Sequence, residues 1–216
     1  MKYRLIIFDF DGTLCDTRQN IIIAFRATME RLGLELRSEA ACGATIGLTL
    51  RDGFRELYPA FDDAEIDHCV DTYRAIFAER RKELMPNLFP CVSRVLEELR
   101  RRGYILSIAS SRLTDSLRLF MDAHDISRHF AFVVGSDSVE RHKPDPEPVL
   151  MTLKELGYRP SEAFVVGDMP VDIAMAHGAG VSACGVTYGN ATRDELLAAG
   201  AEYLIDDIEE LLGVLL

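Results

Sequence analysis

Residues 8–17 read FDFDGTLCDT, and the organisation of the whole chain can be worked out from this stretch. Asp9 and Asp11 stand two positions apart at the end of an apolar run that begins at Tyr3, and a Gly-Thr turn follows at once. Two carboxylates held this close repel each other, so a chain that only had to end a buried strand would gain nothing from them. The pair therefore indicates a functional site at the end of the first strand.

Further apolar runs, rich in β-branched and aromatic residues, follow the first one along the chain. We expect strands at residues 3–8, 105–109, 132–134, 164–166, 183–186 and 203–205. Helical patterns alternate with the later runs, such as the apolar stripe formed by Val92, Val95, Leu96 and Leu99. Strands that are apolar on both faces and alternate with helices predict a parallel sheet covered by helices on each side, a three-layer Rossmann-like α/β core.

The segment from about residue 18 to 88 breaks this alternation, because helical patterns dominate it and no convincing strand occurs. One helical stripe consists of Ile22, Phe25, Met29 and Leu32. A longer amphipathic helix is expected from Ile66 to Leu84, and Pro86 and Pro90 bracket an expected hinge. We therefore predict an all-helical cap domain at 17–88, inserted into a core domain formed by residues 1–16 and 89–216.

Composition narrows the class of protein. The chain has 216 residues, of which 48% are hydrophobic, and a formal net charge of −11. An acidic protein is poorly suited to nucleic acid, which needs a basic face. No stretch approaches the roughly 18 consecutive apolar residues of a membrane span. The five cysteines form no C-x-x-C pair, as expected for reduced thiols. We expect a cytoplasmic protein that binds neither nucleic acid nor membrane.

Polar side chains stand where the predicted strands end. Ser110, Lys143 and Asp168 each follow a different predicted strand, as Asp9 and Asp11 follow the first. The carboxyl ends of the strands in an open parallel sheet share one edge, and ligands bind in the crevice there. We therefore expect carboxylates, a hydroxyl and a lysine from four segments to converge.

Such a set suits a divalent cation and a phosphate. Asp9, Asp168 and the backbone carbonyl of Asp11 offer the hard oxygen ligands that Mg²⁺ prefers, and the cation offsets the repulsion between the paired aspartates. Ser110 and Lys143 can donate hydrogen bonds to phosphoryl oxygens. One aspartate of the pair can attack phosphorus to form an aspartyl-phosphate. Its neighbour can protonate the leaving oxygen and later deprotonate a water.

Four motifs, DFDGTLCDT, IASS, HKPDPEP and VVGDMPVDIAMAHGAG, occur in the order and approximate spacing of the haloacid dehalogenase superfamily. The chain resembles the phosphoglycolate phosphatase-like branch of that superfamily, which carries a helical cap of the C1 type, and the resemblance spans essentially the whole chain. It implies that Asp9 is the nucleophile and a magnesium ligand. Asp11 would be the general acid/base and would bind the metal through its backbone carbonyl.

The same resemblance assigns the remaining core residues. Ser110 and Lys143 would hold the phosphoryl group, and Lys143 would also neutralise Asp9. Asp168 would complete the metal site, which Asp172 would support directly or through water. Ser111 is a departure, because family members often carry Asn or Thr near this position. Ser111 and its neighbour Arg112 could alter contacts with the leaving group.

The resemblance also bears on the reaction and on the cap. Family members that cleave carbon–halogen bonds or phosphonoacetaldehyde lack an aspartate at the position of Asp11, so phosphate transfer remains. The segment TIGLTLRDG around Arg51 resembles the family's cap loop that faces the substrate, and Arg18 lies at the hinge. Either arginine could pair with a substrate carboxylate or second phosphate. A solvated helical arginine explains each position equally well.

These observations together predict a magnesium-dependent phosphatase of small phosphorylated metabolites, such as phosphoglycolate, sugar phosphates or nucleotides, that acts as a monomer or homodimer. The cap would close over the substrate and exclude bulk water. A sugar phosphomutase of the β-phosphoglucomutase type shares every core motif, and a pyrophosphatase could use the same site, so both alternatives stay open. A non-catalytic binding module fits less well, because the whole set of motif residues is present.

Overall fold

The computed structural model describes residues 2–215 and contains a six-stranded parallel sheet in the order β5-β4-β1-β6-β7-β8. The strands are β1 (Leu5–Phe8), β4 (Ile105–Ala109), β5 (Phe130–Val134), β6 (Ala163–Gly167), β7 (Ser182–Val186) and β8 (Tyr203–Ile205). Each matches a predicted strand, and their ends differ by at most two residues. The predicted parallel α/β core is therefore confirmed.

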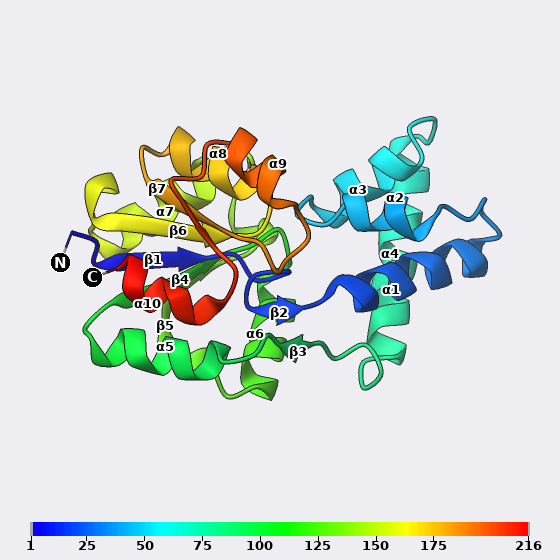
Figure 1. Cartoon of the computed structure of the whole chain (residues 1–216). Coiled ribbons are helices and arrows are strands. Elements are labelled where there is room, and N and C mark those ends of the chain that lie inside the picture. Colours follow the sequence, from blue (N-terminus) through cyan, green and yellow to red (C-terminus); the bar gives the residue numbers. More distant parts are fainter. Residues whose placement is uncertain (1, 216) are drawn as a thin grey trace.

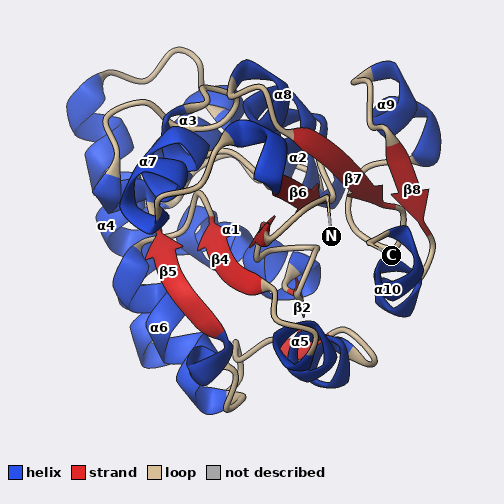
Figure 2. Cartoon of the chain, turned by 90° about the vertical axis from the view of Figure 1, so that its left-hand side faces the viewer, coloured by secondary structure: helices blue, strands red, loops and turns tan. Residues whose placement is uncertain are grey.

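Helices cover both faces of the sheet (Figure 2). One face packs against α5 (Val92–Arg101), α6 (Thr114–Ala123) and α10 (Leu211–Val214), and the other against α7 (Glu147–Leu156), α8 (Pro170–Gly178) and α9 (Arg193–Ala198). Strand β1 shows the alternation expected of a central strand, since Ile6 and Phe8 enter the first of these apolar clusters and Leu5 and Ile7 enter the second.

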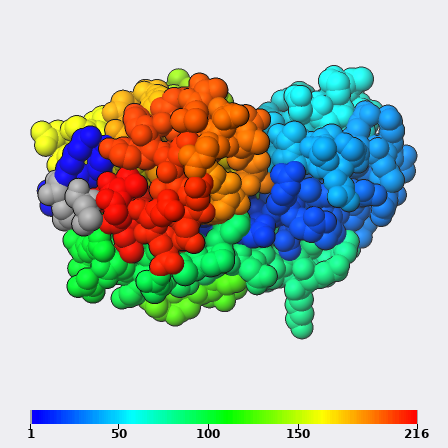
Figure 3. Space-filling model, in the orientation of Figure 1, coloured from blue at the N-terminus to red at the C-terminus, as the bar shows by residue number. Residues whose placement is uncertain are grey.

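Four helices, α1 (Arg18–Leu32), α2 (Glu39–Ala44), α3 (Leu50–Leu57) and α4 (Asp63–Glu79), pack around a third apolar cluster, and we refer to them as the helical unit. The rings of Phe25, Phe54 and Tyr73 meet at its centre, and the centroid of Phe25 lies 4.8 Å from that of Phe54 and 5.2 Å from that of Tyr73. The helical unit lies beyond the carboxyl end of β1, at the opposite end of the molecule from both termini (Figures 1 and 3).

The expected helix from Ile66 to Leu84 is too long. Helix α4 ends at Glu79, and a turn carries the chain on, in which the amide of Leu84 donates to the carbonyl of Arg80. Leu84 is nevertheless fully buried in the apolar cluster of the helical unit. The position of Leu84 in the sequence is compatible with a longer helix, but it is the turn after α4 that brings its side chain to the cluster.

Two chain segments cross between the sheet and the helical unit, and they pair as the antiparallel strands β2 (Cys15–Asp16) and β3 (Asn87–Leu88). The expectation that residues 18–88 contain no strand is therefore wrong for β3, since two residues are too few to show a periodic pattern. Four short 3₁₀ helices complete the secondary structure of residues 2–215: Ser127–His129, Ser136–Ser138, Pro160–Glu162 and Ile208–Glu210. Within these residues, no helix combines the length and the apolar character that crossing a membrane requires.

Candidate active site

Three buried carboxylates meet at the carboxyl edge of the sheet. Asp9 follows β1, Asp168 follows β6, and Asp172 lies in the first turn of α8. Each offers a carboxylate oxygen, and these three oxygens all lie within 4.8 Å of one another. The exposed fraction is 6% for Asp9, 0% for Asp168 and 1% for Asp172. The convergence expected from the ends of the strands is thus present for Asp9 and Asp168, and Asp172 joins them from the first turn of α8.

Lys143 joins two of these carboxylates. Its Nζ atom donates to Asp9 Oδ1 at 2.5 Å and to Asp172 Oδ1 at 2.6 Å, and its side chain is 2% exposed. Burial by itself would lower the pKa of Lys143, but the charges of Asp172 and Asp9 outweigh it and raise the pKa. A buried ammonium group is stable only when it is paired in this way, so Lys143 stays a fixed positive charge between Asp9 and Asp172.

The single positive charge of Lys143 does not neutralise all three carboxylates of the cluster. Burial raises the pKa of Asp9 well above its ordinary value, although Lys143 opposes the shift. Burial, together with the charge of Asp172, raises the pKa of Asp168 to about 7. Each shift means that the ionised form lacks compensation in this structure. Three clustered carboxylates that share one ammonium group are a donor set that fits a hard divalent cation such as Mg²⁺.

Asp168 is held in place by residues that the sequence reasoning missed. Thr13 Oγ1 donates to its Oδ1 at 3.2 Å, and both the backbone amide and the Nδ2 of Asn190 donate to its Oδ2 at 2.8 Å. Gly12 has φ +82°, and a Cβ atom there would lie 2.1 Å from Asp168 Oδ2, so only glycine fits. Asn190 follows the end of β7, and the rule that selected the other strand-end residues could have identified it.

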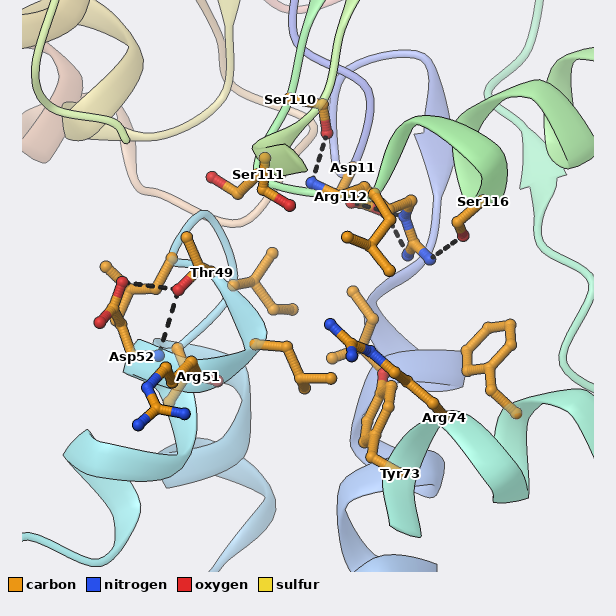
Figure 4. A pocket seen from close by; sticks show the side chains of 18 of the residues that line it. Asp11, Thr49, Arg51, Asp52, Tyr73, Arg74, Ser110, Ser111, Arg112 and Ser116 are labelled. Atoms are coloured by element: carbon orange, nitrogen blue, oxygen red, sulfur yellow. Dashed lines mark hydrogen bonds and ion pairs between the residues drawn. The ribbon is translucent and has the colours of Figure 1, made fainter. Parts of the chain in front are cut away.

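Asp11 has a different partner. The Nε atom of Arg112 lies 3.1 Å from Oδ1 and 2.9 Å from Oδ2 of Asp11, and Nη2 lies 2.7 Å from Oδ1. The exposed fractions of the two side chains are 12% for Arg112 and 14% for Asp11. Figure 4 shows the guanidinium pointing toward Asp11 and Ser116. The two aspartates of the opening motif therefore pair with different cations: Asp9 pairs with Lys143, and Asp11 pairs with Arg112.

The serines after β4 lie in the same region. Ser110 is 6% exposed, and its Oγ atom accepts a hydrogen bond from the backbone amide of Arg112 at 3.2 Å (Figure 4). Ser111 points the other way, and its Oγ atom donates to the carbonyl of Gly47 at 2.6 Å, in the loop between α2 and α3. Ser111 thus connects the edge of the sheet to the helical unit.

A cavity of about 780 Å³ lies between the sheet edge and the helical unit. The sheet side contributes Asp9, Asp11, Ser110, Ser111 and Arg112, and the helical unit contributes residues 45–52 together with side chains from α3 and α4. Arg51 lines this cavity, but its guanidinium pairs with Asp63 and Asp67. Arg18 is absent from its walls, and Nη1 of Arg18 instead donates to Asn190 Oδ1 at 3.0 Å.

Comparisons with known proteins agree with this geometry. Residues 6–186 match the family model described as "Haloacid dehalogenase-like hydrolase". A protein of Dickeya dadantii named "Probable phosphatase IndB" is 36% identical over 211 residues, which cover 97% of this chain and 92% of the relative. "Pyrophosphatase PpaX" of Bacillus velezensis is 32% identical over 97% of this chain and 94% of its own length.

A crystal structure supports the same relationship. The fold superimposes with a TM-score of 0.92 on a haloacid dehalogenase-like hydrolase from Bacteroides fragilis, which is 31% identical and covers 97% of this chain and 100% of its own. The family model matches most of the chain, and the relatives are more than 30% identical to it over nearly their full length. The chain belongs to the haloacid dehalogenase-like hydrolase family.

Proposed function

We propose that the protein is a magnesium-dependent phosphatase that hydrolyses small phosphomonoesters through an aspartyl-phosphate on Asp9. The observation that carries this proposal is the buried Asp9, which lines the cavity while Lys143 and two further carboxylates surround it. A carboxylate that faces a substrate-sized cavity and touches a fixed ammonium group is placed to act as a nucleophile toward a phosphoryl group. The relative named as a phosphatase supports the reaction class.

The proposed reaction has two halves. An Asp9 oxygen attacks phosphorus and the bond between phosphorus and the ester oxygen breaks. Asp11, which is protonated at the start of this half, transfers its proton to that oxygen as it leaves. Asp11 then takes a proton from a water that attacks the phosphoryl group, and the bond between phosphorus and Asp9 breaks to release phosphate. Ser110 and Lys143 donate hydrogen bonds to the phosphoryl oxygens throughout.

The proposed metal ligands are Asp9, Asp168, Asp172 and the backbone carbonyl of Asp11. Mg²⁺ at this place would neutralise carboxylate charge and polarise a phosphoryl oxygen. The residues of the chain supply the rest, because Thr13 and Asn190 orient Asp168 and Lys143 orients Asp9.

A small phosphorylated metabolite is the proposed substrate class. The cavity of about 780 Å³ lies in the range of roughly 300–1,000 Å³ that is typical of small-molecule pockets. We further propose that residues 17–88 act as the cap domain, in which Arg51 faces the substrate and Arg18 lies at the hinge. A monomer or homodimer in the cytoplasm would suit such an enzyme.

Pyrophosphatase activity is the second candidate, and the relative named PpaX favours it. Pyrophosphate has phosphate as its leaving group, so the same residues could act on it. A phosphomutase of the β-phosphoglucomutase type would use the same core residues, and the comparisons reported above do not favour it.

The test is phosphate release from a panel of phosphomonoesters and pyrophosphate, with Mg²⁺ and with a chelator. Asp9→Asn should abolish release, because the amide keeps the shape of the side chain but loses the nucleophile. Asp16→Asn is the matched control, since Asp16 is an exposed carboxylate of the same motif. Release that survives in Asp9→Asn, or that does not depend on the metal, would contradict the proposal.

A further inference from the structure

Arg112 lies at the centre of a small cluster of side chains and has no role in the proposed reaction so far. Its guanidinium contacts both carboxylate oxygens of Asp11, and its Nη1 lies 3.3 Å from Ser116 Oγ. The guanidinium carbon lies 4.8 Å from the ring centroid of Phe120 on α6, which places the cation against an aromatic face. The Phe120 ring and the Ser116 hydroxyl hold the guanidinium at a defined place, so Arg112 can hold Asp11 in turn.

The helical unit takes part in the same cluster. Phe77 of α4 lies with its ring centroid 5.8 Å from the guanidinium carbon of Arg112 and 6.0 Å from the ring centroid of Phe120. Arg112 is therefore held where α4 of the helical unit meets α6 of the core. A displacement of α4 would remove one of the two aromatic rings beside the guanidinium, and would loosen its contact with Asp11.

Asp11 benefits from such a restraint because a second cation, Lys143, contacts its neighbour Asp9. Lys143 contacts Asp9, which stands two residues before Asp11, and an unrestrained Asp11 carboxylate would be attracted to the same ammonium group. The planar fork of an arginine binds both oxygens of a carboxylate at once and so sets its direction. A lysine at position 112 could not do this, because it is a point charge on a flexible stem.

We propose that Arg112 is a positioning residue that directs the carboxyl group of Asp11 toward the leaving group, and that Phe77 makes the contact between Arg112 and Asp11 depend on where the helical unit lies. The inference rests on the proposed function, because it assigns Asp11 a partner in that reaction. It predicts that Arg112 matters most for substrates whose leaving group must receive a proton. Arg112 acts through Asp11, and it takes part in no bond that forms or breaks.

The test compares two phosphomonoesters in the purified full-length protein. An alkyl phosphate needs a proton on its leaving oxygen, whereas p-nitrophenyl phosphate releases an anion that is stable without one. Arg112→Gln should lower kcat for the alkyl ester at least about tenfold, with KM changed less than about threefold. The first turnover of p-nitrophenyl phosphate should change less than about threefold, and it should appear as a burst of p-nitrophenolate before slower turnover.

Matched variants separate positioning from general damage. Arg112→Lys should recover only part of the loss, and Phe77→Leu should lower kcat for the alkyl ester about two- to fivefold. Arg118→Gln removes an exposed arginine of α6, and Phe61→Leu removes a ring of the helical unit that packs on Tyr58. Neither control should change the ratio between the two esters.

A double-mutant cycle completes the test. If Arg112 acts through Asp11, Arg112→Gln should lower the rate less than about twofold in an Asp11→Asn background. Equal losses for the two esters, fully additive losses in the cycle, or an Arg112→Gln rate equal to or above that of the unsubstituted protein would each overturn this inference alone. Failure of the unsubstituted protein to turn over either ester would overturn the proposed function, and this inference with it.

Discussion

Removing divalent metal and raising the pH should weaken the fold, because Asp168 must then ionise without compensation. Burial raises the pKa of Asp168 to about 7 in the folded chain, against about 3.9 in an unfolded chain. Between these two pH values the folded state binds one proton more than the unfolded state, so the free energy of unfolding falls as the pH rises. The pKa of Asp9 is raised as well, and it acts in the same direction.

The size of the effect follows from the shift at Asp168. A difference of about 3 pKa units corresponds to roughly 4 kcal/mol, of which roughly 2.6 kcal/mol is lost between pH 5 and pH 8 in the metal-free protein. For a chain of this length, roughly 2.6 kcal/mol lowers the melting temperature by about 8 °C. Lys143 adds no slope in this window, because its raised pKa keeps it charged throughout.

The assay is thermal unfolding in a chelator from pH 5 to pH 8, for the unsubstituted protein and for Asp168→Asn. The amide keeps the hydrogen-bond acceptor for Asn190 and removes the charge. The melting temperature of the variant should therefore not fall between pH 5 and pH 8 for this reason, and at pH 8 the variant should melt higher than the unsubstituted protein. Saturating Mg²⁺ should restore the stability of the unsubstituted protein and leave the variant unchanged. The comparison also cancels the opposite slope of His129, whose pKa burial lowers.

The reasoning would be refuted by a metal-free protein whose melting temperature, relative to Asp168→Asn, stays constant or rises from pH 5 to pH 8. Such a result would mean that the carboxylate cluster finds compensation without a metal. The fit of this donor set to a divalent cation would then lose its main physical support.

Three further outcomes are expected. Lys143→Met should lower the free energy of unfolding by about 3–5 kcal/mol in urea titrations of the metal-free protein, because it leaves two buried carboxylates unpaired; an unchanged midpoint would contradict this. Gly12→Ala should abolish phosphate release, since its Cβ would overlap Asp168, whereas Gly103→Ala, at φ +89° with open space around it, should cost only about 1–2 kcal/mol of strain and keep activity. Asn190→Leu should weaken Mg²⁺ binding about 10- to 100-fold by calorimetry, because it removes the side-chain donor that orients Asp168 and adds no charge; equal affinity would argue against a positioning role.

The sheet could be predicted well because its signal is local. Each strand is a short apolar run, and alternation with helices leaves few arrangements open. The same alternation fails where the pattern is ambiguous, since Leu84 continues the helical spacing of α4 although it lies in a turn. Strands of two residues, such as β3, are below the length at which any periodicity can be recognised.

The candidate site could be predicted only up to the positions of its residues. The rule that ligands bind at the carboxyl ends of parallel strands predicts that Asp9, Ser110 and Asp168 lie at the same edge of the sheet. It says nothing about which way a side chain turns. Ser111 and Arg18 are both candidates for contact with the substrate; the structure adds that Ser111 lines the cavity and donates to Gly47, and that Arg18 donates to Asn190.

The sequence by itself determined the fold class, the carboxylates of the site and the lysine beside them, because motif spacing and strand ends are properties of the chain alone. Only the tertiary structure decided which cation neutralises which aspartate. Lys143 lies 134 residues from Asp9 and Arg112 lies 101 residues from Asp11, and each pair forms because the folded sheet brings distant segments within hydrogen-bond distance. Which charged groups pair depends on the distance between them and on the direction of their side chains, and a local sequence pattern predicts neither.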